Sequence, residues 1–226
     1  GDVYKRQVLN YCDDQIWLSP DNSLIEKYVG KLKGLGYDLT LEDDGDIFGF
    51  LGINFAKDGA NIVLSQEGLI AKVVSYLGLD DATVKATPAS ADPVGSDKDG
   101  IPFCEDWNYS AAIGMLLYLS TNIFTRADIT FAVSQAAPFS HQPKQSHAIA
   151  VKRIVWYLLG TKDKGLIFKP DIAQGLDCYV DADFAGLYGY EDEQDPASVK
   201  SRTGLSSLCL VVLLFGLASC KQTSPS

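Results

Sequence analysis

The segment Val8–Leu18 reads V-L-N-Y-C-D-D-Q-I-W-L, and the interpretation of the whole chain starts from it. Apolar residues flank two adjacent aspartates, Asp13 and Asp14, and the polar run Ser19–Asn22 follows. Short apolar runs separated by polar residues are typical of a strand, a tight turn and a second strand. The sequence therefore predicts a β-hairpin with both carboxylates at its tip.

Two adjacent carboxylates at a hairpin tip repel each other unless a positive charge lies between them. Mg²⁺ is a natural partner because it prefers carboxylate and phosphate oxygens. Two such ions can activate an attacking hydroxyl and stabilise a leaving phosphate. An Asp-Asp turn without any catalytic role is the alternative, and Tyr11-Cys12-Asp13-Asp14 alone leaves it open.

Length and composition set bounds on the class of protein. The chain has 226 residues, of which 46% are hydrophobic and 21% charged, as expected for one or two globular domains. A net charge of −10 argues mildly against a nucleic-acid partner. The five cysteines have no C-x-x-C spacing, which favours free thiols in a reducing compartment, and we expect an intracellular protein, cytoplasmic or nuclear.

The first third of the chain continues with alternating strand and helix signals. Leu24, Tyr28 and Leu32 recur every four residues and predict a short helix. The stretch Ile47–Ala56 is strand-like, and Asp58-Gly59 is a hairpin turn signal before a further strand at 62–64. We expect Ser65 to cap the next helix, with Leu64 and Leu69 as a hydrophobic staple and an end near Gly78.

The remainder is predicted to be mainly helical. Residues 80–106 are rich in Asp, Pro, Ser and Gly, which indicates a long connection. The predicted helices lie near Tyr109–Thr121, at Ala127–Ala136 and from Pro143 to Gly160, and the predicted strands are Gly165–Phe168 and Leu176–Asp181. Lys152 and Arg153 place positive charge on the last helix, where a solvated helix face is at least as good an interpretation as a nucleic-acid contact.

Six pieces of this sequence, in this order, resemble copia-type retrotransposon Pol polyproteins over residues 8–204. They share the spacing of motifs in the reverse transcriptase and ribonuclease H parts of that family. The pieces are Tyr11–Asp14 (Y-x-D-D), Phe50–Ile53 with Leu64–Gln66, Thr87-Pro88, Tyr109–Ile129 (ending T-R-A-D-I), His147–Thr161, and Asp181–Gly186 with Ser201–Gly204.

The resemblance implies an α+β fold with a defined domain order. Residues 8–90 would form a partial reverse-transcriptase palm, 91–170 a linker and helical thumb or connection, and 171–204 the start of a ribonuclease H-like α/β domain. We interpret residues 1–7 as an adaptor-derived artefact, and residues 205–226 as an out-of-frame tail. A membrane anchor at Leu205–Leu217 is a weaker alternative, because the run is short for a membrane-spanning helix.

The resemblance also implies an activity and roles for single residues. The family is an RNA-directed DNA polymerase with ribonuclease H that uses Mg²⁺, an RNA template, a DNA primer and deoxynucleotides. By that likeness Asp13, Asp14 and Asp181 would bind metal and act in catalysis. Tyr11 would lie near the nucleotide or primer end, and Leu51 and Gly52 would position the primer.

Departures from the family pattern lead us to expect an inactive fragment. Ala127 replaces proline in T-R-P-D-I. A third polymerase aspartate is expected upstream of residue 8, and the later ribonuclease H carboxylates beyond residue 204. The missing parts of the same polyprotein would be its partners, without a membrane. A non-catalytic nucleic-acid-binding remnant, with Lys152 and Arg153 as its contact, is the alternative.

Overall fold

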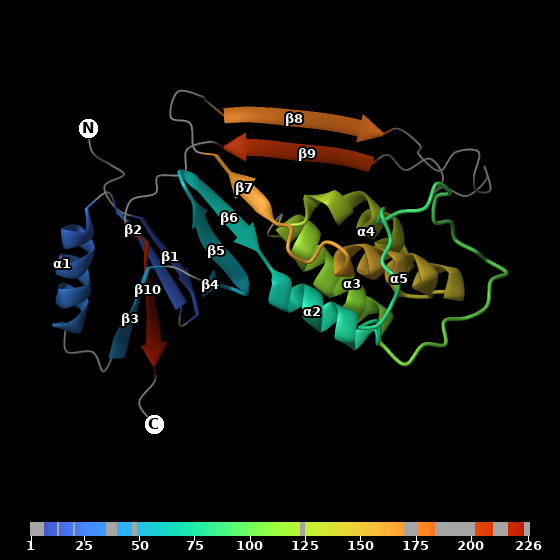
Figure 1. The fold of residues 1–226 in the computed structure, drawn as a ribbon, viewed down its shortest axis with the longest axis horizontal. Coiled ribbons are helices and arrows are strands. Elements are labelled where there is room, and N and C mark those ends of the chain that lie inside the picture. The colour runs from blue at the N-terminus through green and yellow to red at the C-terminus, as the bar shows by residue number, and fades with distance from the viewer. Residues whose placement is uncertain are drawn as a thin grey trace. The chain divides into compact units, whose positions relative to one another are not determined.

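A computed structural model describes residues 7–12, 14–19, 21–34, 40–46, 49–122, 125–169, 176–183, 202–209 and 217–223. For residues 40–46, 122, 176–183, 202–209 and 217–223 only the backbone is described. Helices and strands occupy separate segments, which confirms the α+β class (Figure 1). The chain divides into one unit of residues 1–62, 169–176 and 209–226 and a second unit of residues 63–168 and 177–208.

The first unit begins with the hairpin and helix that the sequence predicted. Strands β1 (Gln7–Tyr11) and β2 (Asp14–Leu18) pair antiparallel, from Gln7 opposite Leu18 to Tyr11 opposite Asp14. Helix α1 (Asn22–Lys33) follows, and its N-cap Asp21 accepts a hydrogen bond of 2.9 Å from the Ser23 amide. Trp17 and Ile25 are buried against each other and hold the helix and hairpin together.

Two strands from distant parts of the sequence complete this sheet. Strand β10 (Leu217–Thr223) pairs antiparallel with both β2 and β3 (Thr40–Asp46), which gives the order β1-β2-β10-β3. In the tail of residues 205–226, the described residues are extended. They belong to the end of β9 (Arg202–Cys209) and to β10, and residues 210–216 lie outside the described residues. Among the residues described, none of the helices combines the length and apolar character needed to cross a membrane.

The stretch expected to be strand-like over 47–56 contains two strands, with a turn between them that was not predicted from the residues; residues 47 and 48 lie outside the described residues. Strand β4 (Gly49–Phe50) pairs with β5 (Ile53–Asp58) so that Phe50 lies opposite Ile53. Leu51 and Gly52 form the turn between them with φ angles of 53° and 74°. Two successive positive φ values are the signature of a two-residue hairpin turn, and an apolar leucine in one of these positions concealed it.

The turn at Asp58-Gly59 is where the sequence placed it. Gly59 has a φ of 60°, and β6 (Asn61–Ser65) begins two residues later. The sheet order is β4-β5-β6-β7, with β7 at Leu166–Phe168. Gly165, just before β7, lies so close to β6 that a Cβ on it would overlap the Leu64 carbonyl.

Helices dominate the second unit (Figure 1). They are α2 (Glu67–Tyr76), α3 (Tyr109–Leu117) with a π-helical turn at Tyr118–Asn122, a 3₁₀ turn at Ala127–Ile129, α4 (Thr130–Ala136), a 3₁₀ turn at Ala137–Ser140, and α5 (Gln145–Leu159). Strand β8 (Leu176–Asp183) pairs with β9. The described backbone of residues 77–108 contains no helix, in agreement with the predicted connection.

The helix ends agree with the sequence better than the helix starts. Helix α2 is followed by Gly78 at a φ of 66°, and Gly160 is the C-cap of α5, both as predicted. Helix α3 begins at Tyr109 as predicted, but the predicted starts of α2 and α5 were wrong. The N-cap of α2 is Gln66, because Ser65 is the last residue of β6. Helix α5 begins two residues after Pro143, where the Lys144 amide donates to Nδ1 of His147 at 2.9 Å.

The core of the second unit forms where α2, α3, α4 and α5 meet. Leu116, Val133, Val151 and Leu158 are among its side chains with no exposed surface. A cluster of aromatic rings from Phe103, Trp107 and Tyr109 extends this core into the connection. Burial of this many apolar side chains supplies the main favourable term for folding of this unit.

Candidate functional site

The tip of the β1–β2 hairpin carries the residues predicted to act in catalysis. Tyr11 and Asp14 form the last pair of the ladder, and Cys12 turns the chain with a φ of 49°. Tyr11 is 57% exposed, and Asp14 is partly buried. Asp13 lies outside the described residues. The hairpin therefore places Tyr11 and Asp14 directly across from each other at an accessible tip.

The chemistry of this tip suits Mg²⁺, although the residues described do not supply a full set of ligands. Carboxylate oxygens are the ligands that Mg²⁺ takes, and it commonly uses one or two of them together with water and substrate phosphates. Asp14 supplies one carboxylate, and Asp13 adds a second by sequence. Within the part of the chain that is described, no three His, Cys, Asp or Glu residues lie close enough to hold a metal ion.

Leu51 and Gly52, the predicted primer contacts, form a second hairpin tip in the same unit. Leu51 is partly buried and adopts a left-handed conformation, which costs a residue with a Cβ about 1–2 kcal/mol. No other atom lies within 4 Å of the position a Cβ would take on Gly52. The turn therefore has free space beside Gly52, and its other residue, Leu51, has a strained backbone conformation.

Lys152 and Arg153, predicted to contact nucleic acid, differ in their surroundings. The Lys152 ammonium donates to both carboxylate oxygens of Glu105 at 2.7 Å. That hydrogen bond is the main reason why the pKa of Glu105 lies below its usual value. Nη2 of Arg153 donates to the Thr87 hydroxyl at 2.9 Å, and no described residue forms an ion pair with Arg153. Lys152 therefore has a carboxylate partner, whereas Arg153 has none among the residues whose side chains are described.

Asp181 lies in β8, paired with β9, and only its backbone is described. Asp14 belongs to the first unit and Asp181 to the second, so the two positions are part of separate bodies. The ribonuclease H role of Asp181 stays a prediction.

The structure contains a buried polar network that the sequence reasoning did not assign to any role. Its centre is Arg126, which is only 2% exposed. The guanidinium donates to both oxygens of Asp128 at 3.0 and 2.8 Å, and to the carbonyl and hydroxyl oxygens of Thr161 at 2.9 and 2.7 Å. Tyr157 donates to Asp128 at 2.6 Å, and its ring lies 5.5 Å from the Arg126 guanidinium carbon.

This network ties the segment before α4 to the end of α5. Burial alone would raise the pKa of Asp128, but hydrogen bonds from Arg126 and Tyr157 outweigh it and hold the pKa below its usual value. The neighbouring Thr125 donates its hydroxyl proton to Gln66 at the start of α2. The T-R-A-D stretch was a family signal in the sequence, and the structure shows that it is a packing junction.

Comparison with known proteins places these features in a family. The retrovirus-related Pol polyprotein from transposon RE1 of Arabidopsis thaliana is 31% identical over 79% of this chain, and that from transposon TNT 1-94 of Nicotiana tabacum is 32% identical over 79%. These matches span 12% and 14% of the two polyproteins. An uncharacterized mitochondrial protein of Arabidopsis thaliana is 25% identical over 79% of the chain, a match that spans 72% of its own length.

No family model and no solved structure matches the chain. The assignment to a family therefore rests on the sequence relatives alone. The chain spans about an eighth of the length of the transposon polyproteins that it matches. It belongs to the family of retrovirus-related Pol polyproteins from transposons, of which it corresponds to a fragment.

Proposed function

We propose that the chain is the part of a retrotransposon reverse transcriptase that carries the Y-x-D-D hairpin, joined to the start of ribonuclease H. The observation that carries this proposal is the register of β1 and β2, which pairs Tyr11 with Asp14 at the tip. A hairpin of this kind fixes the direction of a side chain through backbone hydrogen bonds, so that small ligands meet a preorganised group. The membership in the Pol polyprotein family supports the same conclusion.

In this proposal each residue of the tip has a separate task. Mg²⁺, when bound, would polarise the phosphoryl oxygens of the incoming nucleotide. Asp14 and Asp13 would hold that ion, and the exposed Tyr11 ring would pack against the primer end or nucleotide. The backbone at Leu51-Gly52 would lie along the primer strand, because the absence of a side chain on Gly52 permits close approach. Asp181 would take the corresponding metal-binding role in ribonuclease H.

The metal part of the proposal is testable on this chain with Mn²⁺ as a paramagnetic probe. We expect the amide signals of Tyr11 and Asp14 to broaden at lower Mn²⁺ concentrations than those of Asp58 and Ala60. The turn after β5 is a matched control, because Asp58 is an exposed acid at a hairpin end without a second carboxylate beside it. The substitution D13N/D14N should abolish the selective broadening and D58N should not. Equal broadening at both turns would contradict the proposal.

The polymerase part needs the remaining segments of a polyprotein. Residues 8–204 would replace the matching segment in the polyprotein from transposon RE1, and nucleotide incorporation on a primed RNA template would be measured in Mg²⁺. We expect D13N/D14N to lower incorporation at least about 100-fold, as loss of a metal-positioning group does. The D58N chimera should retain activity. Salt-dependent RNA binding without any incorporation, in a chimera that folds, would instead favour the non-catalytic remnant.

A further inference from the structure

The connection between α2 and α3 carries a Thr-Pro pair whose hydroxyl lies at the surface. Thr87-Pro88 is one of the family-like pieces of the sequence, and neither the proposed metal site nor the proposed primer contact uses it. Thr87 is exposed and lies in a stretch without helix or strand. Its hydroxyl donates to the Ala89 carbonyl at 3.1 Å, a local contact of a kind common in turns. An enzyme that reads Thr-Pro in extended chain can therefore reach this Oγ atom.

Two Ser-Pro pairs elsewhere in the chain allow a comparison. They are Ser19-Pro20 and Ser224-Pro225. Ser19 is only 3% exposed, and its Oγ accepts a hydrogen bond of 3.2 Å from the Asp21 amide. Ser224 and Pro225 lie outside the described residues. Within the described part of the chain, burial separates the two pairs, because Thr87 is accessible and Ser19 is not.

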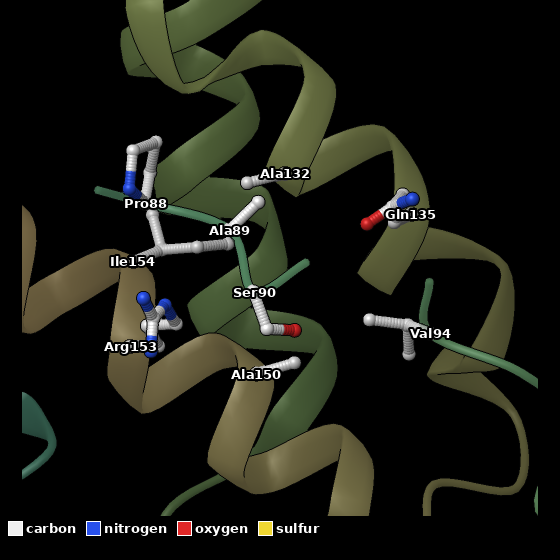
Figure 2. A pocket seen from close by; sticks show the side chains of 9 residues that line it. All are labelled: Pro88, Ala89, Ser90, Val94, Ala132, Gln135, Ala150, Arg153 and Ile154. Carbon is white, nitrogen blue, oxygen red and sulfur yellow. The ribbon is translucent and has the colours of Figure 1, made fainter. Parts of the chain in front are cut away.

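This part of the connection rests on α5 without filling the space beneath it. The Lys85 amide donates to the Trp156 carbonyl of α5 at 3.3 Å. A small cavity of about 20 Å³ lies between Pro88 and Ser90 of the connection and helices α4 and α5 (Figure 2). A segment with a gap beneath it forfeits part of its packing energy, so that local opening costs less than in a filled core. The segment can therefore separate from the helix to enter the active site of another enzyme.

A cation lies where a phosphate on Thr87 would need one. Nη2 of Arg153 donates to the Thr87 hydroxyl oxygen at 2.9 Å, and Arg153 has no ion pair with the side chains described. A guanidinium binds phosphate strongly because its parallel N–H groups match the phosphate oxygens. A phosphothreonine carries a charge of about −1.5 to −2 at pH 7. The neighbouring Lys152 is already paired with Glu105 at 2.7 Å, so Arg153 is the partner that the geometry offers.

We propose that Thr87 is a phosphorylation site for a proline-directed serine/threonine kinase, and that Arg153 binds the resulting phosphate. In the transfer, Oγ of Thr87 attacks the γ-phosphorus of ATP, the bond to the β-phosphate oxygen breaks and ADP leaves, while a carboxylate of the kinase takes the hydroxyl proton. The new ion pair ties the connection to α5. The proposal does not involve Asp13 or Asp14, so its test is independent of the metal and polymerase experiments.

Mass spectrometry tests the site on the full chain. Every sample carries S224A, so that the pair outside the described residues does not contribute. The chain is incubated with a purified proline-directed kinase and ATP, and the modified residue is identified by tandem mass spectrometry. We expect phosphate at Thr87, its loss in T87A and no change in S19A, with circular dichroism as the check that each variant is folded. Absence of phosphate at Thr87, or equal modification of Ser19, would overturn the assignment.

The role of Arg153 is tested by ³¹P titration of the phosphorylated chain. A nearby cation favours the doubly charged phosphate, so the pH midpoint of the ³¹P signal should lie about 0.5–1 pH unit lower than in R153Q. R153K keeps the charge and should restore most of this difference. K164Q is the control, because Lys164 is an exposed cation with no printed contact to Thr87, and it should titrate like the unaltered chain. Equal midpoints in R153Q and the unaltered chain would overturn the proposed pairing.

Discussion

At the residue scale, the most informative side chain is Arg126, because a charge that is 98% removed from solvent must be compensated in full. Asp128 and Thr161 supply that compensation through four hydrogen bonds. A buried guanidinium that loses its carboxylate retains the cost of its desolvation without the matching attraction. The contribution of the Arg126–Asp128 ion pair to the free energy of unfolding is therefore best measured by removing the charge of one of the two residues.

We predict that D128N lowers the free energy of unfolding by about 2–4 kcal/mol, since it leaves Arg126 buried without a carboxylate. Equilibrium denaturation in urea measures this change. D163N is the control, because Asp163 is exposed and should change stability by less than about 0.5 kcal/mol. Equal effects of D128N and D163N would show that Arg126 is stabilised by Thr161 and Tyr157 alone.

The same pair predicts a dependence of stability on pH. The folded-state pKa of Asp128 lies below its value in the unfolded chain, so its contribution is fully present above the unfolded pKa of about 3.9 and is lost as the pH falls through the folded pKa. We expect the free energy of unfolding of the unaltered chain to decrease more steeply below pH 4 than that of D128N. Identical slopes in denaturation at pH 5, 4 and 3 would contradict this.

Leu51 provides a further test at this scale. A left-handed conformation favours glycine or asparagine over a residue with a bulky side chain. We predict that L51N raises the free energy of unfolding by about 1 kcal/mol. A decrease in stability would show that contacts of the leucine side chain exceed the backbone strain. If the proposed primer contact is correct, the chimera with L51N should be more stable and yet extend primers less efficiently.

At the element scale, the close approach of β6 and β7 can be tested with glycines. A Cβ on Gly165 would lie 2.1 Å from the Leu64 carbonyl oxygen, so the two strands must separate to accept it. We expect G165A to lower the free energy of unfolding by about 1–3 kcal/mol. G114A is the control: Gly114 lies inside α3 with open space around it, and alanine there should stabilise by up to about 1 kcal/mol. Thermal unfolding of both variants shows whether each substitution raises or lowers the stability.

The sequence was most successful where one periodic signal determined an element. The apolar runs around Asp13-Asp14 predicted β1 and β2, and the four-residue spacing from Leu24 predicted α1. Prediction from the sequence was less successful where an element depended on an unusual backbone conformation. Leucine rarely adopts a positive φ, so the residue types at Leu51-Gly52 did not predict the turn between β4 and β5 within the strand-like stretch.

The second reason for wrong predictions was that contacts between residues distant in the sequence are not visible in it. Ser65 has the chemistry of an N-cap, but its pairing in β6 leaves that position to Gln66. Lys152 and Arg153 look equivalent in sequence, and only the fold shows that Glu105, 47 residues from Lys152, neutralises one of them. His147, at the start of the family-like piece His147–Thr161, is fully buried and contacts the Lys144 amide and the Gly95 carbonyl, which its sequence neighbours do not reveal.

At the scale of the whole molecule, the two units differ in the size of their cores. Trp17 packs with Ile25 in a small cluster in the first unit, whereas Trp107 belongs to the extensive core of the second. We predict that the tryptophan fluorescence of a W107F/W156F variant, which reports on Trp17, changes at lower urea than that of W17F. Coincident transitions would indicate a single cooperative unit.

Solubility is a second property of the whole chain. The resemblance to a longer polyprotein implies that neighbouring segments cover strand edges and apolar faces, which would be open in this fragment. Val8, Leu9 and Tyr11 on β1 are exposed apolar or aromatic side chains of this kind. We expect the isolated chain to associate as its concentration rises, as measured by light scattering. A monomer with one sharp thermal transition would contradict this expectation.

The hydrogen bond between Thr125 and Gln66 joins two segments that are 59 residues apart, and both belong to motifs that first suggested the family. Each side chain is almost completely buried, so neither can be replaced freely while the other stays. Mutational histories at the two positions should therefore be linked across transposon lineages: where one has drifted to an apolar residue, the other should have followed. The motifs would then record a shared constraint of folding.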